Sequence, residues 1–157
     1  MKTQIGIKTE NSVQVADVLN KLLSDEHVLY IKTRNAHWNV ESPDFAAIHK
    51  FFESQYIQLE EMIDQVAERI RSIDHYAVGT MNNYLKLTQL NEDSRENNDS
   101  ISYIKDLNED HEAVIIELRE NIHRFANDFH DMGSSDFITG LMQKHEKMAW
   151  MLRAHLK

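Results

Sequence analysis

The feature that most constrains this chain is a helical repeat of apolar residues between positions 45 and 73. Apolar side chains recur there mostly every three or four residues, the spacing that places them on one face of an α-helix. They are Phe45, Ile48, Phe52, Leu59, Ile63, Val66, Ile70 and Ile73. The chain has only four Gly and one Pro among its 157 residues, so turns are scarce. Together these observations predict long helices.

Weaker repeats with capping residues at their starts divide the chain into four long helices. The second opens at Ser42-Pro43-Asp44, where Ser is expected as the cap and Pro as the first helical residue. The first is expected to end near Trp38, and a turn over residues 131–135 precedes the last. The four predicted starts are Asn11 or Ser12, Ser42, Asp99 or Ser100, and Ser135.

One connection is much longer than the others. Residues 74–98 separate the second helix from the third, and we expect a short crossing helix within them, over 81–90. Two helical hairpins joined by one long crossover are typical of a ferritin-like bundle, whereas growth-hormone-type bundles need two such crossovers. We therefore predict an all-α, ferritin-like four-helix bundle with a short extra helix in the connection. Residues 1–157 are treated as a single domain.

The composition limits the classes of function. A net charge of −9 disfavours a nucleic-acid surface and favours cations. The absence of Cys excludes disulfides and thiolate metal sites and suits a reducing compartment. No apolar run approaches the length of a membrane span, and Met1 to Ile7 lack the hydrophobic segment of a secretory signal. We therefore expect a cytoplasmic protein with no membrane segment.

Five residues of the types that bind iron recur at helical steps: His37, His49, Glu53, Asp64 and Glu68. His49 and Glu53 are four apart, and so are Asp64 and Glu68, so each pair shares a helix face. The two pairs are separated by about 22 Å along a straight helix, a distance that no single metal centre spans. If the pairs share a site, two copies of the helix must run antiparallel. This points to a metal site at a twofold subunit interface.

Simpler interpretations stay open beside the metal site. An acidic strip on a helix is usually a solvated face, and we interpret Glu60 and Glu61 in that way. A His beside a core stripe is usually a hydrogen-bonded structural residue. That interpretation is applied to His111, His123, His130, His145 and His155. An intrachain di-iron site of the usual ferritin kind needs two Glu-x-x-His motifs, and the chain has only Glu120–His123.

Several of these residues belong to a longer pattern. It comprises Asn35-Ala36-His37-Trp38-Asn39-Val40, Phe45, His49, Glu53, Asp64, Ala67-Glu68-Arg69, Gly79-Thr80 and His145 through Leu152. The pattern resembles the Dps family, the DNA-protecting mini-ferritins, over nearly the whole chain. The resemblance implies a hollow dodecamer, built from twofold dimers, that oxidises Fe(II), preferably with hydrogen peroxide rather than oxygen. It also implies storage of the ferric mineral inside and protection against oxidative stress.

The resemblance distributes the ligands between two subunits. His37, His49 and Glu53 would come from one subunit, and Asp64 and Glu68 from its twofold partner. Asp64 and Glu68 are expected to anchor the tighter iron, with His37 completing it, while the other two bind a second, weaker iron. Two adjacent ferrous ions can pass two electrons to one peroxide. Whether iron or zinc occupies the site in the isolated protein stays open.

Two further assignments have open alternatives. Trp38 adjoins a ligand and is a candidate radical quencher, with core packing as the alternative. Asp131 and Asp136 flank the turn before the last helix, where the resemblance places threefold pores, and carboxylate rings there would focus cations. The alternative is that Asp136 completes a helix N-terminus.

The chain departs from the family pattern in three ways. Ser42 stands where the family usually has Gly, and Glu53 where it often has Asp, which extends that carboxylate by one methylene. The family's DNA binders generally carry a longer basic tail, whereas this sequence offers only Lys2 and Lys8 near its start. We therefore expect weak or no DNA binding. The rival functions are a DNA-compacting scaffold with little iron chemistry and a non-enzymatic helical interaction module.

Overall fold

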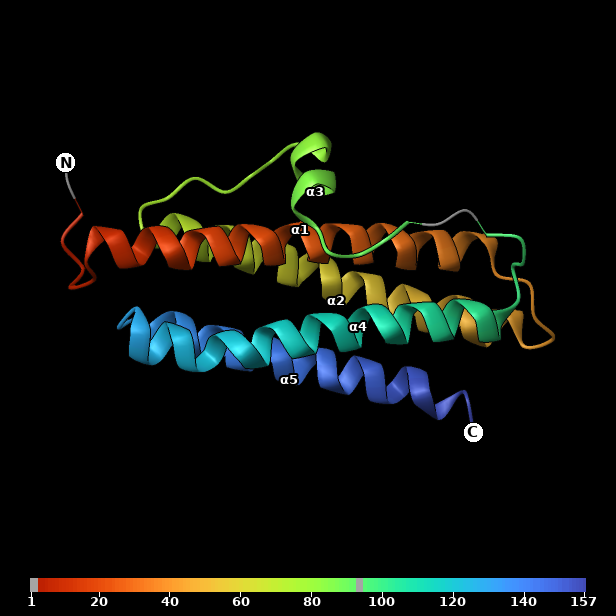
Figure 1. Ribbon diagram of the computed structural model, residues 1–157. Coiled ribbons are helices and arrows are strands. Elements are labelled where there is room, and N and C mark those ends of the chain that lie inside the picture. Colours follow the sequence, from red (N-terminus) through yellow and green to blue (C-terminus); the bar gives the residue numbers. More distant parts are fainter. Residues whose placement is uncertain (1–2, 93–94) are drawn as a thin grey trace.

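The computed structural model describes residues 3–92 and 95–157 as two antiparallel helical hairpins packed into one bundle (Figure 1). One hairpin is formed by α1 and α2, the other by α4 and α5. The helices are α1 (Thr9–Asn39), α2 (Phe45–Ser72), α3 (Met81–Leu87), α4 (Ser100–His123), the π-helical turn η1 (Arg124–Asp128) and α5 (Met132–Ala154). The predicted all-α, ferritin-like bundle with a short extra helix is confirmed. No described helix is long and apolar enough to cross a membrane.

The crossover from α2 to α4 runs back along α1, so α4 starts at the end of the bundle where α2 starts (Figure 1). Its middle is fixed by Asp25, a buried residue of α1. The Asp25 carboxylate accepts hydrogen bonds from the Thr88 hydroxyl at 2.6 Å and the Gln89 amide at 2.8 Å. Burial raises the pKa of Asp25. At the far end, the Glu41 amide donates to the Asn98 carbonyl at 2.8 Å.

The predicted apolar stripe of α2 forms the centre of the core. Most of its members are buried, namely Ile48, Phe52, Leu59, Val66, Ile70 and Ile73. The prediction is wrong for Phe45, which is 45% exposed and stacks on His49 with ring centroids 5.0 Å apart. Met62 and Gln55 are buried instead. Phe45 lies at the first position of α2, where the helix has not yet entered the bundle interior.

The predicted helix starts are right for α4 and shifted for the others. Asp99 caps α4 by accepting the Ser102 amide at 2.9 Å. Helix α1 begins at Thr9, before the predicted caps, and the Ser12 hydroxyl donates to the Thr9 carbonyl instead of capping a helical amide. Helix α2 begins at Phe45 rather than at Pro43, since the Ser42 hydroxyl donates to the Asp44 carboxylate instead of capping a helical amide.

Helix α5 starts three residues earlier than predicted. Asp131 is its N-cap and accepts the Ser134 amide at 2.9 Å, so the predicted turn over 131–135 is already largely helical. Arg69 of α2 reaches this start, with Nε donating to the Ser134 hydroxyl at 3.0 Å and Nη2 to Asp131 at 3.3 Å. A Cβ on Gly133 would lie 2.9 Å from the Arg69 guanidinium. Glycine therefore permits this close approach between α2 and α5.

Candidate metal centre

The last turn of α1 and the first turns of α2 bring His37 and His49 together. Their rings stack with centroids 3.7 Å apart and planes 20° from parallel. His37 Nδ1 lies 2.7 Å from the His49 carbonyl oxygen, and His49 Nδ1 lies 2.7 Å from the His37 carbonyl oxygen. His37 is buried and His49 half-buried. Two predicted ligands are thus held rigidly against each other within one chain.

These reciprocal bonds decide which ring nitrogens can bind a metal. A carbonyl oxygen only accepts, so each Nδ1 must carry the proton and donate. The neutral ring then keeps its lone pair on Nε2, the atom that a metal ion needs. Metal-bound His commonly donates its other N–H to a carbonyl in this way, which fixes the tautomer and the ring orientation. His37 and His49 therefore have the donor set of metal ligands.

The end of α1 explains why the His37 carbonyl is available. In a continuing α-helix the Glu41 amide would bond to the carbonyl four residues earlier, that of His37. The Glu41 amide bonds instead to Asn98, at the end of the crossover. The terminal carbonyl of His37 is thereby left to accept from the His49 ring. The long connection thus helps to orient the histidine pair.

The three predicted carboxylates lie elsewhere along α2. Glu53 follows His49 by one turn and is half-buried, whereas Asp64 and Glu68 are exposed on the other half of the helix. Glu60 and Glu61 are exposed in the single chain. Among the described residues, no cluster of three or more His, Asp or Glu within one chain could hold a metal ion. Within one chain, therefore, the two histidines are in contact, but the five predicted ligands do not come together.

Aromatic residues that were not predicted from the sequence border the histidine pair. The Tyr56 ring packs edge-on against two other rings. Its centroid lies 5.2 Å from the His37 centroid and 6.1 Å from the Tyr30 centroid. The Arg34 guanidinium lies over the rings of Trp38 at 4.9 Å and Tyr56 at 5.0 Å. The spacing of Tyr30, Arg34 and Trp38, four residues apart on α1, was the available signal.

Trp38 itself is not a core residue. Its side chain is 61% exposed, so the core-packing alternative is wrong for the single chain. Other large apolar residues of α1 and α2 are also exposed, namely Ile31, Phe45 and Ile57.

The two candidate pore residues have different environments. Asp131 is buried and engaged as the cap of α5 and the ion-pair partner of Arg69. Asp136 is exposed and lies beyond the first turn of α5, so the alternative that it completes the helix N-terminus is wrong. The only cap role at this end belongs to Asp131, among the described residues. A pore role therefore rests on Asp136.

The remaining histidines divide into two groups. His111 and His145 are buried and hydrogen-bonded to each other, as the structural interpretation predicted. The same interpretation is wrong for His123, His130 and His155, which are exposed. The exposed three lie near helix ends, where the apolar repeat that suggested burial no longer faces the core.

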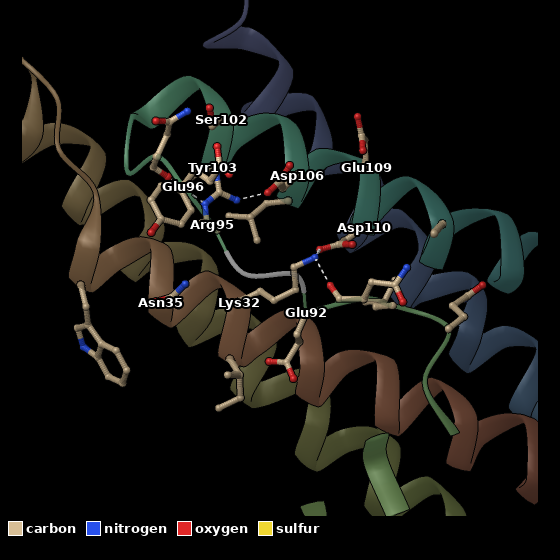
Figure 2. A pocket seen from close by; sticks show the side chains of 18 residues that line it. Lys32, Asn35, Glu92, Arg95, Glu96, Ser102, Tyr103, Asp106, Glu109 and Asp110 are labelled. Carbon is tan, nitrogen blue, oxygen red and sulfur yellow. Dashed lines mark hydrogen bonds and ion pairs between the residues drawn. The ribbon is translucent and has the colours of Figure 1, made fainter. Parts of the chain in front are cut away.

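A cavity of about 780 Å³ lies between α1, the end of the crossover and the first half of α4 (Figure 2). Its basic groups are already paired: Arg95 with Asp106, and Lys32 with Asp110. Trp38 lines one edge. Neither His37 nor His49 lines this cavity, so it is not the candidate metal centre.

Comparison with known proteins agrees with this fold. The ferritin-like domain model matches residues 16–157. A low temperature-induced protein of Nostoc sp. is 37% identical over 156 residues, 99% of this chain and 87% of the relative. The DNA protection during starvation protein 2 of Bacillus anthracis is 36% identical over 143 residues, 91% of this chain and 97% of the relative.

Solved structures lead to the same class. The Dps protein of Vibrio cholerae O1, described as a ferritin-like diiron-carboxylate protein, superposes with a TM-score of 0.92 at 32% identity. The match covers 100% of this chain and 98% of that one. The chain therefore belongs to the Dps family of ferritin-like proteins. Membership in this family implies iron binding.

Proposed function

We propose that this protein is a ferroxidase and iron store whose oxidation sites form between two copies of the chain. The observation that carries the proposal is the His37–His49 pair, in which reciprocal Nδ1 bonds leave both Nε2 atoms free for a metal ion. Iron is the substrate and cargo of this site, in keeping with the family. The protein would thereby limit the reaction of free Fe(II) with peroxide.

The register of α2 supports a twofold site. The midpoint between the His49–Glu53 pair and the Asp64–Glu68 pair lies at residues 58–59. His49 and Glu68 are equally far from this point, and so are Glu53 and Asp64. An antiparallel second copy centred there brings His49 level with the partner subunit's Glu68, and Glu53 level with the partner subunit's Asp64. Two equivalent sites then form in each dimer.

The exposed side chains of α2 fit the same arrangement. At about 100° per residue, Ile57 falls within the arc occupied by the four α2 ligands. It is 53% exposed, one residue from the midpoint. A large aliphatic side chain among carboxylates is more easily explained by a packed partner than by solvent. We therefore place the twofold axis near Ile57, and the resemblance extends the dimer to a dodecamer.

The residues present can perform the chemistry in a simple division of roles. Asp64 and Glu68 supply negative charge that attracts and holds Fe(II), and His37 and His49 supply neutral imidazole nitrogens. The longer Glu53 carboxylate reaches the second iron position. Two ferrous ions side by side deliver two electrons to one hydrogen peroxide, which takes up two protons from solvent and becomes two waters without release of a hydroxyl radical. The ferric product passes to the acidic interior.

Peroxide is expected to oxidise bound iron faster than oxygen does. The reason is that the two electrons of one ferrous pair reduce hydrogen peroxide fully to water, whereas the same two electrons reduce oxygen only as far as peroxide. Stopped-flow absorbance of the ferric product, with each oxidant added in equal oxidising equivalents, measures both rates. Faster oxidation by oxygen would contradict the proposed oxidant. Absence of any soluble ferric product with either oxidant would contradict the ferroxidase itself.

Asp136→Asn is expected to slow iron uptake at low iron while leaving the oxidation sites intact. An exposed carboxylate repeated around a threefold pore would concentrate cations at the entrance, and its loss lowers the entry rate. The measurement is oxidation rate against Fe(II) concentration, in which the variant should approach the wild-type rate at high iron. Asp17→Asn, an equal charge change at another exposed site, is the control. Equal slowing in both variants would rule out a specific entrance.

A DNA-compacting function is less well supported. The Bacillus anthracis relative is named for DNA protection. This chain has a net charge of −9, and phosphate contact requires clustered Lys or Arg. We therefore propose iron chemistry, rather than DNA binding, as the protective activity.

A further inference from the structure

A cluster of three ionisable residues lies in the bundle core, apart from the proposed iron ligands. It consists of Glu26 from α1, His145 from α5 and His111 from α4, and all three are buried. Glu26 precedes His37 on α1 by eleven residues, about 16 Å along the axis. His145 Nε2 lies 2.6 Å from Glu26 Oε1, and His145 Nδ1 lies 2.9 Å from His111 Nδ1. This buried chain joins three helices from both hairpins.

The contact between the two histidines limits how many protons they can hold. A hydrogen bond between two Nδ1 atoms needs one donor and one acceptor, so one imidazole must keep a lone pair there. The folded pair therefore carries at most one positive charge, whichever ring holds it. Burial and the neighbouring His145 also hold the pKa of His111 well below its usual value. The bond between the rings thus limits the pair to one charge, and the lowered pKa of His111 favours His111 as the uncharged member.

Few other charged groups could offset the positive charge of a second proton on the histidine pair. Between α1 and α4, the ion pairs Lys21–Glu117 and Lys32–Asp110 lie on either side of the buried chain and are already formed. From α5 the group that faces His111 is His145 itself. None of the buried residues of α2 is ionisable. The one carboxylate that contacts the histidines is Glu26, among the described residues.

We propose that the Glu26–His145–His111 chain is an acid-sensitive lock between the two hairpins. Once the bundle opens, the bond between the two Nδ1 atoms no longer limits protonation, and a free imidazole takes up its proton near pH 6.5. Below that pH the open form binds at least one proton more than the closed form. Opening is then favoured about tenfold more for each pH unit of acidification. The stabilisation is present above pH ~6.5 and is lost as the pH falls.

The fold makes the junction between the hairpins the place where opening occurs. Helices within each hairpin contact each other far more extensively than the hairpins contact one another. The buried chain crosses this sparser junction, since Glu26 belongs to the first hairpin and both histidines to the second. Proton uptake is therefore coupled to separation of α1 from α4 and α5. Acidification would loosen the bundle without requiring any change at His37 or His49.

The test compares the pH dependence of stability in three assembled proteins. His111→Asn keeps an amide near the Nδ1 position but does not titrate, and His123→Asn makes the same change at an exposed site on the same helix. Urea unfolding between about pH 7.5 and 5 gives the folded-to-unfolded ratio of each. Below pH ~6.5 the wild-type ratio should fall about tenfold more per pH unit than that of His111→Asn. The His123→Asn protein should follow the wild type.

Equal pH slopes for the wild type and His111→Asn would overturn the lock. If the asparagine variant does not assemble, His111→Phe keeps a planar ring without a titrating group and must show the same reduced slope. Hydrogen exchange at the two ends of the pH range locates the opening. Acid should lower the protection factors, which correct for the pH dependence of intrinsic amide exchange, in α4 and α5 around the two histidines more in the wild type than in the variant. Uniform exchange changes in both proteins would also contradict the proposal.

Discussion

The Ile57→Asp variant is expected to lose the twofold dimer and, with it, at least about tenfold in the rate of iron oxidation. In the proposed dimer the new carboxylate would lie beside the same carboxylate of the partner subunit and near the partner subunit's Glu60. Burying such unpaired charges costs several kcal/mol, and each 1.4 kcal/mol is about tenfold in an equilibrium. Native mass spectrometry gives the assembly state, and stopped-flow absorbance gives the rate on the same sample.

Gln58→Asp is the matched control for this experiment. It adds the same charge to the next residue of α2, which is also exposed but lies outside the arc of the ligands. The control should assemble and oxidise iron normally. Circular dichroism should show that both variants keep the helical bundle, because neither position is in the core. A fully assembled and active Ile57→Asp protein would remove the twofold axis from this part of α2.

The parts of the fold that depend on local sequence were predictable. The apolar repeat of α2 and the Asp99 cap of α4 depend on residues close together in sequence, and both predictions were confirmed, with Phe45 as the exception in the repeat. The start of α5 was missed because Gly133 suggested a turn. Asp131 nevertheless caps a helix there, and the glycine is needed for the approach of Arg69 from α2. Contacts between distant segments cannot be inferred from local spacing.

The candidate site, too, was only partly predictable from local sequence. Residue types and helical steps were enough to single out His37 and His49, but not their reciprocal carbonyl bonds, which depend on the turn between α1 and α2 and on Asn98. Nothing in the local sequence singled out Glu26, because its partner His145 is 119 residues away. Asp25 and Glu26 are in fact both buried, and each is hydrogen-bonded to a segment more than sixty residues away in sequence.

The central claim, that each oxidation site is shared between two chains, has a direct test by complementation. His49→Ala and Asp64→Ala, made as separate proteins, should each oxidise iron poorly. When they are co-assembled, a mixed dimer collects both substitutions in one site and neither in the other. Random pairing makes about half of the dimers mixed, so about a quarter of the normal sites should return. The matched control combines His49→Ala with Glu53→Ala, which alter the same half-site.

The decisive measurement is therefore the rate of ferric absorbance in co-assembled His49→Ala and Asp64→Ala protein, with mixing verified by native mass spectrometry. The shared site predicts recovery to about a quarter of the wild-type rate, and no recovery for the His49→Ala and Glu53→Ala mixture. Verified mixed assemblies of the first pair that remain as inactive as their parents would contradict a site divided between two chains.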